Sequence, residues 1–235
     1  MALGKKTLQD LLSPISEQLG HDGVAETVEM PEWQVKPVRA TDGLSQDALV
    51  EMFITEASKI RVTVHRCSAA TLPETLSAIV AAGTPDDGEP AGVVCADNGH
   101  FASVGLYEAL RDTQNVADLH VWDPALGEEN VQFALKATYG ITYASEGIAE
   151  TGTIVQPTNP HCGRAVSLLP LVHIAVIDAA TIKPTMAEVM HGLEAAYTRP
   201  SQVCFISGPS ATSDIELVRV EGVHGPMYVH YVVVE

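Results

Sequence analysis

The stretch SQDALVEMFITEASKIRVTVHRC, residues 45–67, contains one complete helix–strand unit and indicates how the rest of the chain is built. Ser45 is a candidate helix cap, because a serine hydroxyl accepts a hydrogen bond from the free backbone N–H groups of the first turn. The residues that follow place an apolar face at helical spacing: Leu49, Met52, Phe53, Ala57 and Ile60. Segment 62–67 opens with a β-branched run and predicts a strand.

The same alternation continues to the C-terminus. Helices are predicted over residues 71–83, 103–112, 128–140 and 184–198. Strands are predicted over residues 93–96, 118–123, 141–145, 153–157, 173–178, 202–207 and 227–235. Helices that alternate with short apolar strands favour a largely parallel sheet that is covered on both faces. We therefore expect an α/β fold, a three-layer sandwich, in residues 45–235, preceded by a lead-in segment of residues 1–44.

The composition limits the partners. The 235-residue chain has a formal net charge of −17 and a pI near 4.7, so its mean field repels phosphate backbones and anionic lipids. Neither nucleic acid nor a membrane is expected as a partner, although a local pocket can still bind a small anion. The longest apolar stretch, residues 168–180, is too short to span a bilayer. Without a recognisable signal peptide, the chain is expected to be cytoplasmic.

The four cysteines are dispersed along the chain and form no CxxC motif. Cys67, Cys95 and Cys204 lie in apolar runs, where a free cysteine usually packs as a small hydrophobic residue. We expect no metal and no cofactor in this chain. The sequence also lacks the Walker, GxGxxG, GxSxG and HExxH motifs, so it offers no direct signal for a nucleotide enzyme, a hydrolase or a metalloprotease.

A first candidate site follows the strand at 141–145. Glu150, Thr151, Gly152 and Thr153 combine an acid, two hydroxyls and a glycine, which suits a hydroxylated or phosphorylated ligand. The alternative is a simple turn whose hydroxyls satisfy the backbone. Arg164 is a candidate anion clamp, because its guanidinium can hold a carboxylate or phosphate through two hydrogen bonds. A local acid such as Glu150 is its alternative partner.

A second candidate site lies in residues 207–226. Ser210 or Thr212 can cap a short helix after the strand at 202–207, and a helix N-terminus that follows a glycine turn binds anions. Asp214 and Glu216 fit this site, but acids in a first helical turn also interact favourably with the helix dipole alone.

His224 lies between two glycines and a proline, on a predicted tight turn. Its imidazole is suited either to acid–base chemistry or to binding a carboxylate, and a structural turn histidine is the alternative. His161 and Cys162 are weaker candidates, since their loop shows no recognisable partner. His65, His120 and His173 lie in predicted strands and are expected to be hydrogen-bonded structural residues.

Several separated motifs resemble the LUD-domain family, in particular its lactate utilization protein C group. They are AETGT (149–153), R-x-x-SLLP (164–170), HIAV (173–176) and SGPSATSDIELVRVEGVHGP (207–226), in the order of the family. The resemblance covers residues 45–235 and is densest from residue 144 onward. The chain departs from the family at Ala211, where an arginine is usual, so a basic contact is missing near this position.

The resemblance implies a fold related to the NagB/RpiA/CoA-transferase-like α/β sandwich. It also implies a role in the oxidation of L-lactate to pyruvate together with iron–sulfur partner proteins. Because the cysteines of this chain are not clustered, the iron–sulfur clusters are expected in those partners. Three hypotheses follow: a non-redox subunit that binds a small carboxylate or phosphate, a free-standing enzyme acting on a CoA ester, sugar phosphate or folate, or a pure assembly module.

Under the first hypothesis, Arg164 and His224 bind the carboxylate, and Glu150 or Asp214 lies near the hydroxyl. The expected catalytic residues are therefore Glu150, His224 and Asp214. The expected ligand-binding residues are Thr151, Gly152, Thr153, Arg164, Ser210, Thr212, Glu216 and Gly225. This site requires the loops after strands 141–145 and 202–207 to converge on one cleft at the carboxyl ends of the strands.

Overall fold

The computed structural model describes residues 6–24, 38–83, 91–196, 200–212 and 220–235. The chain divides into two units, residues 1–38 and residues 39–235. The first unit contains helix α1, Lys6–Gln18, which the sequence pattern did not predict. In this unit the Ser16 hydroxyl donates a hydrogen bond to the Gly23 carbonyl at 2.6 Å. All the elements described below belong to the second unit.

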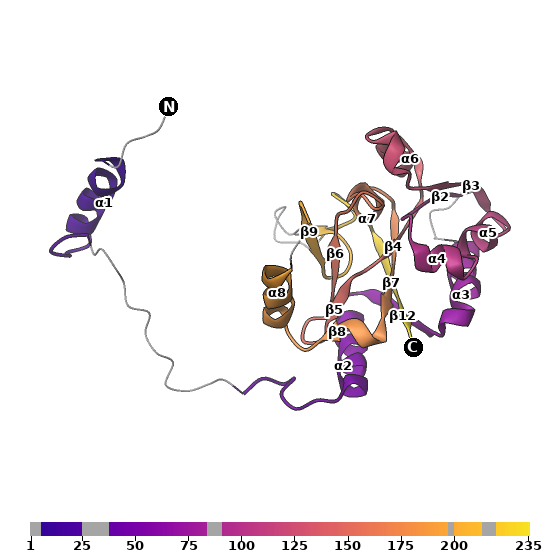
Figure 1. The fold of residues 1–235 in the computed structure, drawn as a ribbon, viewed down its shortest axis with the longest axis horizontal. Helices are drawn as coiled ribbons and strands as arrows, with labels where there is room; N and C mark the ends of the chain where they lie inside the picture. Colours follow the sequence, from indigo (N-terminus) through magenta and orange to yellow (C-terminus); the bar gives the residue numbers. More distant parts are fainter. Residues whose placement is uncertain (1–5, 25–37, 84–90, 197–199, 213–219) are drawn as a thin grey trace. The chain divides into compact units, whose positions relative to one another are not determined.

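Six parallel strands form the main sheet, in the order β1-β12-β7-β4-β2-β3 (Figure 1). Their bounds are β1 Val62–Cys67, β2 Ala91–Cys95, β3 Val116–Val121, β4 Tyr139–Tyr143, β7 Val172–Asp178 and β12 Tyr228–Val234. The first and last of these strands are neighbours, with Val62 opposite Val229. The predicted α/β fold with a parallel sheet is confirmed.

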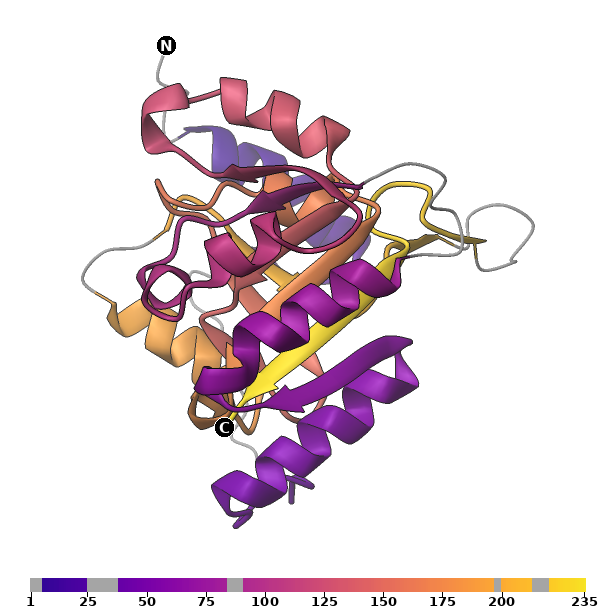
Figure 2. The ribbon, with the colours of Figure 1, turned by 90° about the vertical axis from the view of Figure 1, so that its right-hand side faces the viewer.

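Helices cover both faces of the main sheet. Side chains alternate between the two faces along each strand, so neighbouring residues of one strand pack against different helices. On β7, Ile174 and Val176 pack with α3 (Leu72–Ala82), α4 (Gly99–Ser103) and α5 (Leu106–Arg111). Ala175 and Ile177 pack on the opposite face with α2 (Gln46–Lys59). Helices α6 (Glu129–Lys136) and α7 (Ala165–Leu168) share the face of α2. Figure 2 shows α2 and α3 on opposite sides of β1 and β12.

A second sheet of four strands, in the order β8-β5-β6-β9, lies on the α2 side. Its strands are β5 Glu146–Ile148, β6 Thr153–Pro157, β8 Ile182–Lys183 and β9 Val203–Ile206. Strand β6 runs antiparallel to both β5 and β9, so the strands predicted near 153–157 and 202–207 do not join the parallel sheet. Helix α8, Met186–Ala195, packs on this sheet through Val189.

Two predicted helices have different bounds in the structure. Helix α6 ends at Lys136, and Gly140, predicted as its terminal glycine, lies inside β4. A Cβ at Gly140 would overlap the carbonyl oxygen of Val166, so the glycine allows α7 to lie against the strand. The helix predicted over 103–112 is divided at Gly105, whose left-handed backbone (φ 71°) separates α4 from α5.

No helix begins at Ser210, contrary to the prediction. Ala211–Thr212 form strand β10, which pairs antiparallel with β11, Val220–Glu221. The predicted helix N-terminus is therefore absent from residues 210–212, and the rest of that predicted helix lies outside the described residues. Three short 3₁₀ helices connect other elements: η1 Ala69–Thr71, η2 Pro124–Leu126 and η3 Ala179–Thr181. Within the described ranges, every helix is too short or too polar to cross a bilayer.

Candidate functional site

A chain of three hydroxyls joins the two predicted loops. The Thr151 and Thr153 hydroxyls lie 2.7 Å apart, and the Thr153 hydroxyl lies 2.7 Å from that of Ser207. The antiparallel register places Ile154 opposite Ile206, so Thr153 and Ser207 meet where β6 begins and β9 ends. The two loops therefore contact each other at this position.

Two glycines attach these loops to the end of α2. Gly152 (φ 61°) lies so close to the helix that a Cβ would overlap its backbone and stand 2.6 Å from the Cα of Ala57. Gly208 (φ 78°) lies against the carbonyl oxygen of Ile60 in the same way. The Tyr231 hydroxyl donates to the Ile206 carbonyl at 2.8 Å. Both glycines thus have a packing role at the end of α2.

Glu150 contacts the start of α8. Its carboxylate accepts a hydrogen bond of 3.0 Å from the backbone N–H of Met186, the first residue of that helix. An acid at this position satisfies a free backbone donor and interacts favourably with the helix dipole. The structure thus assigns a capping contact to this carboxylate.

Backbone hydrogen bonds connect the described parts of the 207–226 stretch. Ser210 donates its backbone N–H to the Pro226 carbonyl at 2.9 Å and accepts from Gly222 at 3.0 Å. A Cβ at Gly225 would stand 3.2 Å from the Ser210 Cβ. Thr212 lies in β10. Asp214 and Glu216 lie outside the described residues.

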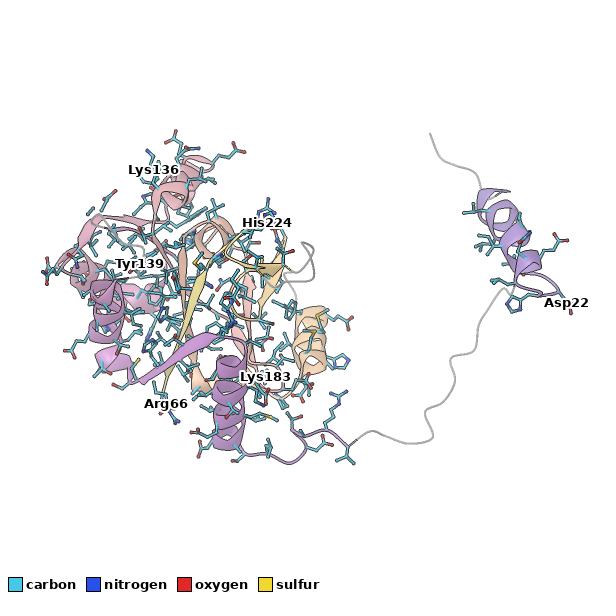
Figure 3. All side chains as sticks on the ribbon, turned by 180° about the vertical axis from the view of Figure 1, so that it is seen from behind. Asp22, Arg66, Lys136, Tyr139, Lys183 and His224 are labelled. Atoms are coloured by element: carbon cyan, nitrogen blue, oxygen red, sulfur yellow. The ribbon has the colours of Figure 1, made fainter. Side chains whose placement is uncertain are left out.

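Arg164 and His224 lie at opposite ends of α7. Arg164 immediately precedes the helix and donates to the Gln202 side chain at 3.1 Å. The loop of His224 lies beside Leu168, the last residue of the helix, because a Cβ at Gly225 would stand 3.6 Å from the Leu168 carbonyl. Both side chains are exposed. Figure 3 shows His224 and Arg66 at opposite ends of the second unit. Because Arg66 is near the carboxyl end of β1, His224 lies at the amino-terminal edge of the main sheet.

Arg164 is also separated from the hydroxyl chain. Gln202, its partner, precedes β9, and Thr158, which donates to the Gln202 carbonyl, follows β6. The hydroxyl chain lies at the other end of the same strand pair. Four residues of β9 lie between Gln202 and Ser207, which makes five steps along the strand, a distance of about 16 Å. The contacts of the described residues therefore divide the predicted site into two places.

A cleft of about 340 Å³ lies at the amino-terminal edge of the main sheet. It is lined by Arg61, Thr63, Pro209, Glu221, Met227, Tyr228, Val229 and His230. Most of the lining residues come from residues 207–226 and from the start of β12. The predicted site lies at the carboxyl ends of the strands, whereas this cleft opens beside the starts of β1 and β12.

Arg61 supplies the positive charge of the cleft. Its Nη1 lies 2.6 Å from Oε2 of Glu221, and its side chain is 66% exposed whereas that of Glu221 is only 19% exposed. Arg61 also has a left-handed backbone (φ 64°), which is uncommon for a residue with a side chain. No local motif indicates this cleft, because Arg61 and Thr63 come near Glu221 only when β1 pairs with β12.

His230 gives the cleft a neutral imidazole. Burial, with a smaller contribution from His65, lowers the pKa of His230 to about 4. Its ring nitrogen Nδ1 lies 3.1 Å from Nε2 of His65 on the neighbouring strand. Another strand histidine, His173, is fully buried against the Thr142 hydroxyl at 2.9 Å, as expected of a structural residue.

A larger cavity of about 730 Å³ lies between the end of α8 and residues 157–160. Burial raises the pKa of Glu146 in its wall, and Lys183 opposes this shift. None of the sequence-predicted site residues lines this cavity. Across the described ranges, no three His, Cys, Asp or Glu side chains gather to hold a metal ion.

The second unit thus has an α/β fold in which a parallel sheet and a smaller mixed sheet carry a polar cleft with one guanidinium and one neutral imidazole. The family model of the LUD domain matches residues 50–234. The chain belongs to the LUD-domain family.

Relatives named lactate utilization protein C align along almost the whole chain. The protein of Geobacillus sp. strain WCH70 is 36% identical over 95% of this chain and 93% of its own length. That of Oceanobacillus iheyensis is 33% identical over 95% of this chain and 96% of its own. That of Bacillus velezensis is 33% identical over 100% of this chain and 98% of its own.

Among solved structures, a DUF162 family protein from Deinococcus radiodurans has a similar fold. Its crystal structure superposes with a TM-score of 0.54 at 22% sequence identity and covers 82% of this chain and 99% of that one. This similarity supports the fold.

Proposed function

We propose that this chain is a component of an L-lactate utilisation system, in which it binds a small carboxylate and does not itself carry electrons. The proposal depends chiefly on the nearly full-length similarity to proteins named lactate utilization protein C. Iron–sulfur proteins are the proposed partners and would hold the clusters. The cysteines support this division of roles, because Cys95 and Cys162 are buried and burial raises the pKa of both thiols, whereas clusters bind thiolates.

The cleft at Arg61 is the proposed carboxylate site. A guanidinium presents several N–H donors in a planar fork that matches a carboxylate. The Thr63 hydroxyl and the His230 ring line the same cleft and supply further hydrogen-bonding groups. Because Glu221 already contacts Nη1 of Arg61, an incoming carboxylate would share the guanidinium with it. Glu221 therefore moderates the affinity of the proposed site.

The size of lactate limits what the cleft alone can achieve. Lactate has about six non-hydrogen atoms, and the best very small ligands gain at most about 1.5 kcal/mol per atom. The cleft of about 340 Å³ has room for more than one such molecule. A partner protein or a larger ligand is therefore proposed to contribute to binding in the working system.

The residues predicted from the sequence enter this proposal in two groups. Thr151, Gly152 and Thr153 hold Ser207 and the following turn against α2, next to Pro209 in the cleft wall. In the second group, Ser210 and Gly225 fold the loop that carries His224. The proposed catalytic roles of Glu150, His224 and Asp214, and the proposed ligand contacts of Thr212 and Glu216, stay predictions. Arg164, if it binds an anion, would do so at a separate place.

We further propose that the fold is a three-layer relative of the NagB/RpiA/CoA-transferase-like sandwich, as the motif resemblance implies. One observation favours a second function, that of an assembly module. Gly152, Gly208 and the hydroxyl chain all serve packing between loops and α2. If the motifs only stabilise the fold, substitutions in the cleft will change stability and leave ligand binding unaffected.

Isothermal titration of L-lactate and pyruvate into the purified chain tests the proposal. Arg61→Asn removes the charge and suits the site, because asparagine tolerates a left-handed backbone. We expect at least a roughly tenfold weaker affinity, since one charge-assisted hydrogen bond contributes about 1.5–3 kcal/mol. Arg111→Gln, on the exposed end of α5, is the matched control and should bind as the wild type does. Equal affinity of the Arg61→Asn variant and the wild type would contradict the proposed site.

A further inference from the structure

His65 of β1 and His230 of β12 form a hydrogen-bonded pair at the wall of the cleft. Both side chains point to the same face of the sheet, because His230 is opposite Thr63, two residues before His65. Nε2 of His65 lies 3.1 Å from Nδ1 of His230. The ring centroids are 5.3 Å apart with an interplanar angle of 20°. The centroid separation exceeds the nitrogen separation by about two ring radii, so the rings meet edge to edge, as an N–H···N hydrogen bond requires.

This hydrogen bond couples the two rings. In a neutral pair, one of the two facing nitrogens carries the proton and the other accepts it. If His65 donates, Nε2 of His230 carries a proton, and it can donate a hydrogen bond. If His230 donates from Nδ1, its Nε2 has only a lone pair. The tautomer of His65 therefore determines whether the outer nitrogen of His230 donates or accepts.

The surroundings keep this pair neutral in the free protein. Burial lowers the pKa of both histidines, and His65 lowers the pKa of His230 further. The titratable groups that share the cleft are Arg61, Glu221 and Tyr228. Arg61 opposes a second positive charge, whereas Glu221 is already paired with Arg61. On the same face, Cys67 lies along β1, and α3 carries Glu74 in its first turn.

An anion in the cleft would instead favour the protonated form of the histidine pair. A carboxylate near His230 favours the charged imidazole, because opposite charges at a few ångströms stabilise each other strongly where water is partly excluded. The added proton binds the outer nitrogen that has a lone pair, and the proton already in the hydrogen bond can shift between the facing nitrogens, so that the two rings share the charge. The pair is therefore expected to bind one proton when an anionic ligand is present in the cleft.

We propose that the His65–His230 pair takes up one proton from solvent when a small carboxylate binds in the Arg61 cleft, so that the anion and the proton are bound together. This inference rests on the proposed carboxylate site. The ligand remains a carboxylate, and the proton from solvent forms an N–H bond at the outer ring nitrogen that has the lone pair, while the proton already between the facing nitrogens lets the two rings share the positive charge. The bound species is equivalent to the undissociated acid, and the net charge of the cleft does not change on binding.

Isothermal titration of L-lactate at pH 5.5 and at pH 7.5, each in two buffers of different ionisation enthalpy, measures the proton uptake directly. Lactate stays ionised at both values, since carboxyl groups of this kind titrate near pH 3.5 to 4. We expect up to one proton per bound ligand at the lower pH, less at the higher pH, and an affinity that rises by up to tenfold per unit of decreasing pH.

Four variants identify the proton-binding group. His65→Gln and His230→Gln should both abolish the uptake and flatten the pH dependence, whereas His191→Gln, on the exposed face of α8, should change neither. Glu221→Gln removes the other candidate proton acceptor and should leave the uptake in place. Thermal unfolding of each variant confirms that it is folded.

The outcomes separate the two proposals. Lactate binding without proton uptake, or uptake that is lost only in Glu221→Gln, overturns the role of the histidine pair and leaves the carboxylate site intact. Uptake that persists in His65→Gln does the same. Absence of lactate binding at both pH values overturns the carboxylate site and this inference with it.

Discussion

Replacing Gly152 by alanine tests whether the candidate site depends on attachment of its loops to α2. The backbone at Gly152 is left-handed (φ 61°), and a Cβ there would stand 2.6 Å from the Cα of Ala57. The left-handed conformation costs an alanine about 1 kcal/mol. Overlap with backbone, which cannot rotate away as a side chain can, adds about 2 kcal/mol. We therefore expect Gly152→Ala to destabilise the protein by about 3 kcal/mol.

Gly43→Ala is the matched control for this experiment. Gly43 is also left-handed (φ 76°), but no atom lies within 4 Å of the position a Cβ would take. This variant should therefore lose only the conformational part, about 1 kcal/mol. In a protein of this size, the two losses correspond to a decrease in melting temperature of roughly 6–12 °C for Gly152→Ala and roughly 2–4 °C for Gly43→Ala. Scanning calorimetry measures both, and equal decreases would refute the claimed contact with α2.

Three further predictions concern named side chains. Burial lowers the pKa of His173 to about 3, so as the pH falls below about 6.5 the unfolded chain binds a proton at this histidine before the folded protein does. The free energy of unfolding should therefore decrease by up to about 1.4 kcal/mol per pH unit down to about pH 3. His173→Gln should reduce this slope in denaturant titrations. Glu150→Ala removes the contact with Met186 at the start of α8 and should lower the free energy of unfolding by about 0.5–1 kcal/mol. Retained activity of this variant in a lactate assay would refute a catalytic role for Glu150. Tyr231→Phe removes a buried hydroxyl that donates to the Ile206 carbonyl, so we expect a loss of about 1 kcal/mol in urea unfolding, and an unchanged stability would show that this bond is not needed.

The parts of the fold that depend on neighbouring residues could be predicted from the sequence. The helix after Ser45 begins as expected, with the serine side chain accepting from Ala48, and β1 follows it as predicted. Local spacing determines these elements, because a helical face and a cap are encoded within a few residues. The strand order and the second, mixed sheet are not predicted, since a sequence pattern does not show which strands pair.

Errors at single residues have the same origin. Gly140 was interpreted as a helix end because glycine is common there, but its small size is needed against Val166, a contact between separate elements. Ser210 was interpreted as a cap, but its backbone pairs with Pro226 and Gly222 instead.

The candidate cleft could not be assembled from the sequence. Arg61 and Glu221 are 160 residues apart and meet because the first and last strands of the main sheet are neighbours. The motif stretch that begins at residue 207 correctly indicated where unusual loop chemistry is concentrated. It did not show that the cationic partner of this stretch is Arg61, or that Arg164 is held by Gln202 elsewhere.

Reconstitution of lactate oxidation tests the central claim most directly. The purified chain is assayed for L-lactate-dependent dye reduction, alone and together with its proposed iron–sulfur partners. We expect no reduction by the chain alone, reduction by the assembled system, and a loss of at least roughly tenfold when Arg61→Asn replaces the wild-type chain, with Arg111→Gln unaffected. Dye reduction by the isolated chain, or a full rate with Arg61→Asn, would contradict the account.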